Sequence, residues 1–148
     1  MADAVSAIAP EDRELRVLLG EARTIAVVGL SSKPGRPSLD VAAYLQAHGY
    51  RVVPVNPRET EVLGEHAYPS LRDIPSDLPI DVVDVFRRAE ETPDAARDAV
   101  AIGAKVLWLQ DGIVSEEAYR IASEAGLEVI MGVCIRRTKQ RLDREGSA

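Results

Sequence analysis

Residues 24–38 read TIAVVGLSSKPGRPS, a continuous apolar run followed by a loop of small, polar and basic residues. An apolar run of this length is typical of a strand that is buried on both faces of a parallel sheet. Gly29 lets the chain turn sharply at the end of the run. Pro37 is well suited to the first turn of the helix that we expect next. The stretch therefore predicts a strand–loop–helix unit.

The same alternation continues along the rest of the chain. Apolar runs predict strands at 24–30, 51–55, 81–86, 105–109 and 127–131, and amphipathic patterns predict helices at 10–22, 37–48, 92–102, 115–125 and 135–144. Short connections between them imply right-handed βαβ units. The predicted fold class is α/β, a Rossmann-like doubly wound five-stranded parallel sheet with the expected order 3-2-1-4-5. Its switch point then lies between strands one and four, and a ligand is expected at the carboxyl ends there.

Two segments depart from this regular alternation. Residues 56–80 are rich in proline and predict an irregular crossover. Pro54 within the second strand cannot donate a ladder hydrogen bond, so it belongs at a strand end or on a lightly paired side. We expect a single domain over 1–148, with its core at about 10–145.

Composition excludes several classes of protein. Of the 148 residues, 46% are hydrophobic and 28% are charged, and the net charge is −6. This balance disfavours a nucleic-acid partner, which needs a basic face. The single cysteine excludes an internal disulfide. The chain lacks the ~20 consecutive apolar residues that span a bilayer, and its first residues do not resemble a secretory signal. We expect a cytoplasmic protein with no membrane partner.

The loop after the first strand is the best candidate for an anion site. Serine hydroxyls and the free N–H groups at the start of a helix donate hydrogen bonds to anions, and two cations add positive charge. This predicts a cradle for a diphosphate. The alternative is an ordinary β–α turn whose cations are solvated. The predicted cradle consists of Gly29, Ser31, Ser32, Lys33, Arg36, Pro37 and Ser38.

This loop is not the dinucleotide fingerprint, because position 31 is serine and position 34 is proline. The second strand ends in Asn56, Pro57 and Arg58 and lacks the acid that holds an NAD ribose. Arg58 would suit an extra phosphate on a ribose, as in coenzyme A or NADP. The alternative is a turn-forming Asn-Pro followed by a solvent-facing arginine.

Three further strand ends carry candidate contacts. Phe86 could stack on adenine, and Arg87 could reach a phosphate or instead pair with an acid, Asp84 or Glu90. Gln110 could bond the amides of a ligand, and Gly112 permits close approach. Trp108 is expected in the core. No metal-ligand spacing, nucleophile elbow or other catalytic constellation is visible, and neither His48 nor His66 is expected to be functional.

Together these residues resemble the small stand-alone CoA-binding proteins, which are similar to the N-terminal domain of the succinyl-CoA synthetase α subunit. The likeness covers about 24–134 and includes IAVVGLSSKPGRPSLDVAAYLQAHGYRVVPVNP, DVVDVFRRAEETPDAARDAV and KVLWLQDGIVSEEA. It implies that coenzyme A is the ligand. The implied roles are Gly29, Ser31, Ser32 and Arg36 on the diphosphate, with Lys33 beside them; Asn56, Pro57 and Arg58 on the adenosine and its phosphate; Phe86 and Arg87 as the wall; and Gln110 on the pantetheine arm.

The leading hypothesis is binding of coenzyme A or an acyl-CoA without catalysis, with a protein partner or a homo-oligomer as a further possibility. The alternatives are a subunit of an acyl-CoA enzyme completed by a partner, and an NADP-binding redox sensor. Cys134 follows the last strand at the same carboxyl edge. Its thiol could form a mixed disulfide with the pantetheine sulfur, or it could be a small buried core residue. The second reading is favoured.

Overall fold

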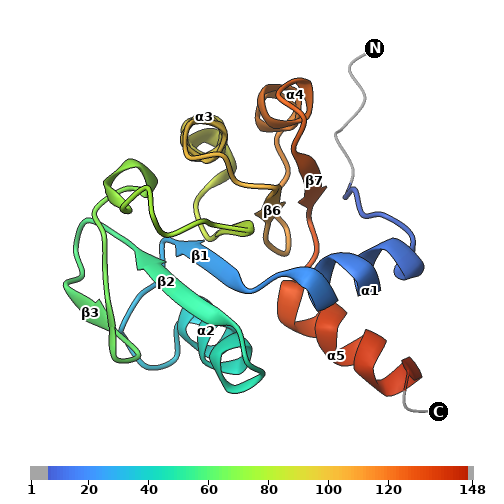
Figure 1. The fold of residues 1–148 in the computed structure, drawn as a ribbon, viewed down its shortest axis with the longest axis horizontal. Helices are drawn as coiled ribbons and strands as arrows, with labels where there is room; N and C mark the ends of the chain where they lie inside the picture. Colours follow the sequence, from blue (N-terminus) through green and yellow to red (C-terminus); the bar gives the residue numbers. More distant parts are fainter. Residues whose placement is uncertain (1–6, 147–148) are drawn as a thin grey trace.

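A computed structural model describes residues 7–146 and contains the predicted parallel sheet. Its strands run in the order β2-β1-β5-β6-β7, and every neighbouring pair is parallel (Figure 1). This confirms the α/β class and the Rossmann-like parallel sheet. The strands are β1 (Thr24–Val28), β2 (Arg51–Val55), β5 (Val82–Val85), β6 (Val106–Leu109) and β7 (Glu128–Met131).

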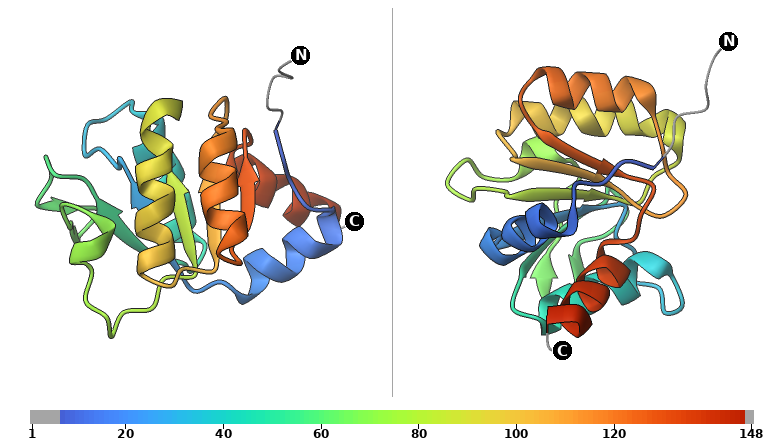
Figure 2. Two further views of the ribbon diagram at one scale, coloured as in Figure 1. Left: turned by 90° about the horizontal axis from the view of Figure 1, so that it is seen from above. Right: turned by 90° about the vertical axis from the view of Figure 1, so that its right-hand side faces the viewer.

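Helices cover both faces of the sheet, as a doubly wound fold requires (Figure 2). One face carries α1 (Asp12–Glu21), α2 (Pro37–Ala47) and α5 (Ile135–Gly146), and the other carries α3 (Thr92–Ala101) and α4 (Glu116–Glu124). Each layer has its own apolar core, with Trp108 and Ile130 on the first face and Leu107 and Met131 on the second. Alternate residues of one strand thus serve opposite cores. Within residues 7–146, no helix has the length and apolar character needed to cross a bilayer.

The strand order differs from the predicted 3-2-1-4-5 at one strand. Numbered along the chain, the five strands run 2-1-3-4-5, because β5 pairs with β1 on the side away from β2. Pro54 supplies the physical reason. Its carbonyl accepts from the Tyr68 amide at 3.0 Å on the outer edge of β2, where its missing N–H leaves a gap in the ladder. A strand with such a gap belongs at the edge of a sheet. The switch point therefore lies between β1 and β5.

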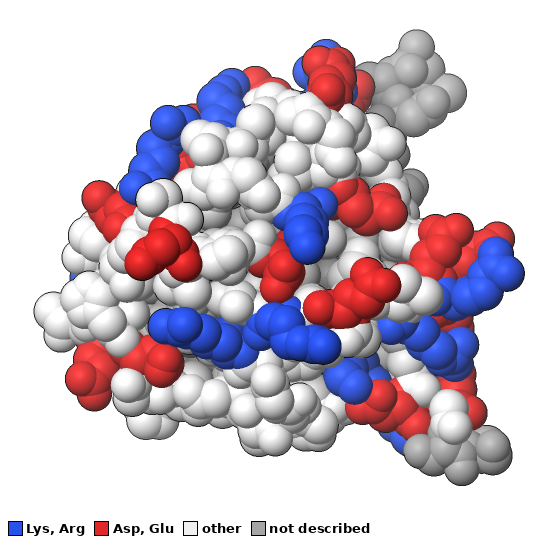
Figure 3. Space-filling view, in the orientation of Figure 1, with Lys and Arg blue, Asp and Glu red and all other residues white. Residues whose placement is uncertain are grey.

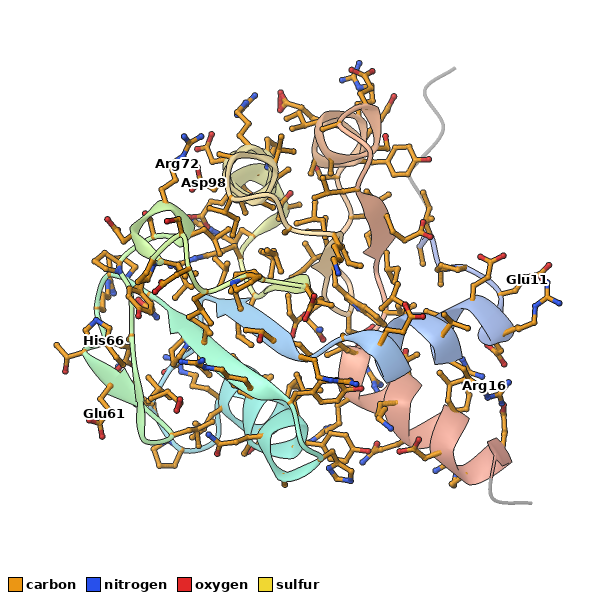
Figure 4. The ribbon with its side chains drawn as sticks, viewed as in Figure 1. Glu11, Arg16, Glu61, His66, Arg72 and Asp98 are labelled. Carbon is orange, nitrogen blue, oxygen red and sulfur yellow. The ribbon has the colours of Figure 1, made fainter. Side chains whose placement is uncertain are left out.

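The predicted irregular crossover contains a small hairpin and a single helical turn. The hairpin consists of β3 (Glu61–Val62) and β4 (Glu65–His66), and the turn is the 3-10 helix η1 (Leu71–Asp73). Leu71 is buried in the core on the α3 side. Arg72 pairs with Asp98 of α3 at 2.6 Å (Figure 4). The crossover is thereby fixed to α3, next to the carboxyl ends of β1 and β5.

The starts of two helices follow local chemistry. Ser115 caps α4, since its hydroxyl accepts from the Ala118 amide at 3.1 Å. Thr92 is the first residue of α3, and its hydroxyl donates to the Ala89 carbonyl at 2.6 Å. A 3-10 turn, η2 (Ala89–Glu91), precedes the helix and supplies that acceptor.

A carboxyl group lies at the centre of the sheet. Asp84 of β5 has no exposed surface, and one of its oxygens accepts from the Gln110 amide. Its other oxygen, Oδ2, has no hydrogen-bond partner among residues 7–146. Burial, opposed by the Gln110 hydrogen bond, raises the pKa of Asp84 from 3.8 to about 7. The folded state therefore holds this proton more tightly than the unfolded chain does. As the pH rises from about 4 to about 7, the free energy of unfolding falls, and above that range it levels off.

We expect Asp84→Asn to remove this dependence on pH, because a neutral amide has no ionised form to bury. At pH 8 the variant should be more stable than the wild type, by on the order of 4 kcal/mol. At pH 4 the two proteins should unfold at similar temperatures. Thermal unfolding followed by circular dichroism at pH 4, 6 and 8 measures the difference, and the other carboxyls cancel in the comparison. A variant that is less stable than the wild type by the same amount at every pH would contradict a raised pKa of Asp84.

Candidate functional site

A cavity of about 1100 Å³ opens at the switch point between β1 and β5. The helix after β1 packs on one face of the sheet and the helix after β5 packs on the other, which leaves a crevice between their first turns. Loops after β1, β2 and β5 form the walls, together with the start of η1 and one side of α3. The predicted residues that line it are Gly29, Ser31, Ser32, Lys33, Arg36, Pro37, Ser38, Asn56, Pro57, Arg58, Phe86 and Arg87.

Gly29 brings the three loops together at the bottom of this cavity. Its φ is +86°, and a Cβ atom built there would lie 2.3 Å from the Phe86 carbonyl oxygen. Its amide donates to the Val55 carbonyl at 2.8 Å. Any side chain at this position would therefore push the loop after β1 away from the loop after β5.

Hydrogen bonds within the loop after β1 hold its serines in place. The Ser31 amide donates to the buried Ser38 hydroxyl oxygen at 3.1 Å, and the Lys33 amide donates to the Ser31 hydroxyl oxygen at 3.1 Å. Arg36 is the N-cap residue of α2. The first turn of a helix leaves backbone N–H groups without intrahelical acceptors. Ser31 and Ser38 thus act mainly on the shape of the loop, which presents the helix start to the cavity.

Asn56 joins the loop after β2 to the loop after β1. Its side-chain amide donates to the Leu30 carbonyl at 3.0 Å, and its oxygen accepts from the Arg58 amide at 2.9 Å. The residue is only 9% exposed. The turn that Asn56 makes with Arg58 is an Asx turn, a common use of asparagine before a bend. The structure therefore gives Asn56 a positioning role, because its side chain fixes the backbone at Arg58.

Ser32 contacts Glu59, which is not among the predicted site residues. Its amide donates to Glu59 Oε2 at 2.8 Å and its hydroxyl donates to Glu59 Oε1 at 2.8 Å. The hydrogen bond from the Ser32 amide, followed by that from its hydroxyl, lowers the pKa of Glu59. Glu61 and Glu65 are also glutamates in the same stretch of sequence, so sequence position alone could not identify Glu59 as the partner of Ser32. Only the contact between the two loops distinguishes it.

Basic and acidic side chains both line the cavity. Among residues 7–146, no carboxylate forms a salt bridge with Lys33, Arg36, Arg58 or Arg87, although all four line the cavity. The expected alternative of an Arg87 pair with Asp84 or Glu90 is thus not formed. The acids that line the cavity are Glu59, beside Ser32, and Glu91, Asp94 and Asp98, at η2 and α3. On the face drawn in Figure 3, the basic and acidic side chains of the described residues are likewise interspersed.

Three predicted residues are not among those that line the cavity: Gln110, Gly112 and Cys134. Gln110 is 3% exposed and donates to Asp84. The predicted strand order explains the difference. It placed the loop after β6 next to β1, whereas β5 lies between them. Gly112, with φ +75°, lies in that same displaced loop.

Cys134 is farther away, after the edge strand β7, and packs in the core with Trp108 and Ile135. It is 9% exposed. The structure thus agrees with the reading of Cys134 as a buried packing residue and does not place it at the cavity. Trp108 is a core residue as predicted, and its indole N–H donates to the Val133 carbonyl at 2.9 Å.

Comparison with known proteins places the chain among relatives that share this fold. It is 45% identical over 127 residues to the uncharacterized protein YneT of Bacillus subtilis, covering 86% of this chain and 93% of that protein. It is 30% identical over 122 residues to the ADP-forming acetate–CoA ligase II subunit alpha of Pyrococcus furiosus, covering 76% of this chain but 27% of that subunit.

A solved structure of a hypothetical protein from Pyrococcus horikoshii OT3 superposes with a TM-score of 0.88 at 40% identity, covering 95% of this chain and 99% of that one. The family model described as "CoA binding domain" matches residues 23–138, which include all five strands of the sheet and every residue named at the cavity. The chain therefore belongs to the CoA binding domain family and is related to a subunit of an acyl-CoA ligase.

Proposed function

We propose that this protein binds coenzyme A, free or acylated, in the cavity between β1 and β5. The observation that carries the proposal is that four cations line this cavity, Lys33, Arg36, Arg58 and Arg87, and that none of them forms a salt bridge within residues 7–146. A diphosphate and a ribose phosphate together need several such cations, and charge-assisted hydrogen bonds to phosphate are the strong ones. Membership of the CoA binding domain family supports the same ligand.

We assign different lining residues to different parts of the ligand. Ser32, Lys33 and Arg36 surround the start of α2 and suit the diphosphate, because the helix dipole also favours negative charge there. Arg58 comes from the loop after β2 and suits the phosphate on the ribose. Phe86 and Arg87 form the wall at the end of β5. Gln110 has no part in this proposal, since its amide is used by Asp84 in the core.

The form of the proposal is binding without catalysis. Among the described residues, those lining the cavity include neither histidine nor cysteine. The hydroxyls of Ser31 and Ser38 accept hydrogen bonds within their own loop, and those of Ser32 and Ser70 donate to the carboxylates of Glu59 and Asp73. A second candidate function is a subunit of an acyl-CoA enzyme whose catalytic residues come from a partner protein. The 30% identity to a ligase subunit favours it.

We expect coenzyme A to raise the melting temperature of the protein more than NADP, NAD or ATP does at equal concentration. A ligand that binds only the folded state stabilises it in proportion to the logarithm of its concentration over its Kd. Differential scanning fluorimetry over a concentration series of each ligand measures the shift and its saturation. A larger saturating shift with NADP would instead support a redox sensor.

Arg36→Ala should weaken the binding of coenzyme A by roughly 10- to 150-fold, since it removes a charge-assisted hydrogen bond worth about 1.5–3 kcal/mol. The fold should be retained, because Arg36 is exposed. The control is Arg51→Ala. It removes the same charge at the amino end of β2, whereas the cavity lies at the carboxyl ends of the strands. Isothermal titration calorimetry compares the two. Equal affinities for both variants and the wild type would remove Arg36 from the proposed site.

Arg58→Ala should weaken only the contact with the ribose phosphate. We expect the variant to lose about tenfold in affinity for coenzyme A, the scale of one charged contact. Its affinity for dephospho-coenzyme A, which lacks that phosphate, should equal that of the wild type. Calorimetry of the wild type and the variant with each of the two ligands gives the interaction free energy between Arg58 and the ribose phosphate. An equal loss for the two ligands would place Arg58 on the diphosphate instead.

A further inference from the structure

The Ser32 donors that face the cavity are already occupied by an anion from the chain itself. Glu59 lies in the loop after β2, whereas Ser32 lies in the loop after β1, and both line the cavity. One carboxylate oxygen accepts from the Ser32 amide and the other accepts from its hydroxyl, each at 2.8 Å. Two adjacent oxygens of a phosphate group could accept from the same two donors.

The surroundings of Glu59 favour a negative charge at this point. The positive charge of Lys33 adds to the Ser32 hydrogen bonds in lowering the pKa of Glu59, so the carboxylate is ionised near neutral pH. Arg36 also lines the cavity and has no salt bridge among residues 7–146. One carboxylate therefore leaves much of the positive charge around the site uncompensated.

We propose that Glu59 is an internal competitor for the anion position at Ser32, and that it thereby determines which ligands the site accepts. Because Glu59 is held nearby by the chain, its effective concentration at Ser32 is high. A simple monovalent anion gains no more from Ser32 than Glu59 already provides, so it does not displace the carboxylate. A diphosphate also gains the contacts with Lys33 and Arg36, and it does displace it.

This inference rests on the proposed function only for the identity of the ligand, since any polyvalent phosphate would compete with Glu59 in the same way. Glu59 could instead be a positioning residue that holds Ser32 ready for the ligand. The two roles predict opposite effects of removing the carboxylate. A competitor lowers affinity while it is present, whereas a positioning residue raises it.

The test is calorimetric titration of the wild type, Glu59→Ala and Glu59→Gln with inorganic pyrophosphate and, separately, with coenzyme A. Glu59→Ala should bind each ligand about tenfold more tightly than the wild type, which corresponds to about 1.4 kcal/mol. Glu59→Gln should fall between them, because its amide oxygen can accept a hydrogen bond but carries no charge. Thermal unfolding checks that each variant is folded.

The matched control is Glu61→Ala. Glu61 carries the same charge two residues away, is exposed on the outer side of the β3–β4 hairpin and does not line the cavity (Figure 4). Its removal should change affinity by less than about twofold, because exposed charges are screened by salt.

The outcomes separate this inference from the proposed function. Unchanged or weaker pyrophosphate binding by Glu59→Ala overturns the competitor role, and weaker binding assigns Glu59 to positioning. Tighter pyrophosphate binding by Glu59→Ala, with no binding of coenzyme A by any of the proteins, supports the competitor role and overturns the proposed function. Binding of pyrophosphate by none of the proteins overturns the competitor role, and binding of coenzyme A by none of them overturns the proposed function.

Discussion

The backbone of Gly29 passes so close to the Phe86 carbonyl that a Cβ atom would lie 2.3 Å from its oxygen. This approach occurs where β1, the strand between β2 and β5, reaches its carboxyl end, and the Gly29 amide is also bonded to Val55 of β2. The loops from three strands therefore meet around one residue without a side chain. The cavity, its cationic side and the contact between Ser32 and Glu59 all depend on that meeting point.

Charge is treated in opposite ways inside the sheet and at its edge. At the centre, Asp84 is fully buried with one oxygen unpartnered among the described residues, and burial raises its pKa. At the carboxyl ends of the strands, the hydrogen bonds from Ser32 favour the ionised form of Glu59, and Lys33 and Arg36 form no salt bridge among those residues. Burial favours the neutral form of Asp84 and brings its pKa to about 7, while hydrogen bonds favour the ionised form of Glu59. The second arrangement suits an anionic ligand.

Most of the fold could be predicted from the sequence, because apolar runs and turn residues identify strands and helices locally. The order of the strands depends on which side of β1 the chain returns to, and periodicity does not encode that choice. Pro54 did carry the information, since a strand with a missing donor belongs at an edge. An edge position for β2 removes the strand that we predicted on its outer side and leaves β5 free to pair with β1, as it does in the structure.

The site residues that belong to one continuous loop could be predicted from the sequence. The contacts between two separate loops could not. The loop after β1 lines the cavity with all seven of its predicted residues. The Asn56 contact with Leu30 and the Glu59 contact with Ser32 join separate loops. Such contacts follow from the three-dimensional approach of the loops, so no local pattern distinguishes Glu59 from Glu61.

A crystal structure of the protein grown with coenzyme A tests the proposed site most directly. We expect the diphosphate within hydrogen-bond distance of the Ser32 amide and the Arg36 guanidinium, with the Glu59 carboxylate moved off Ser32. A diphosphate bound elsewhere on the protein, or one bound beside a Glu59 that still accepts from Ser32, would contradict the proposed site.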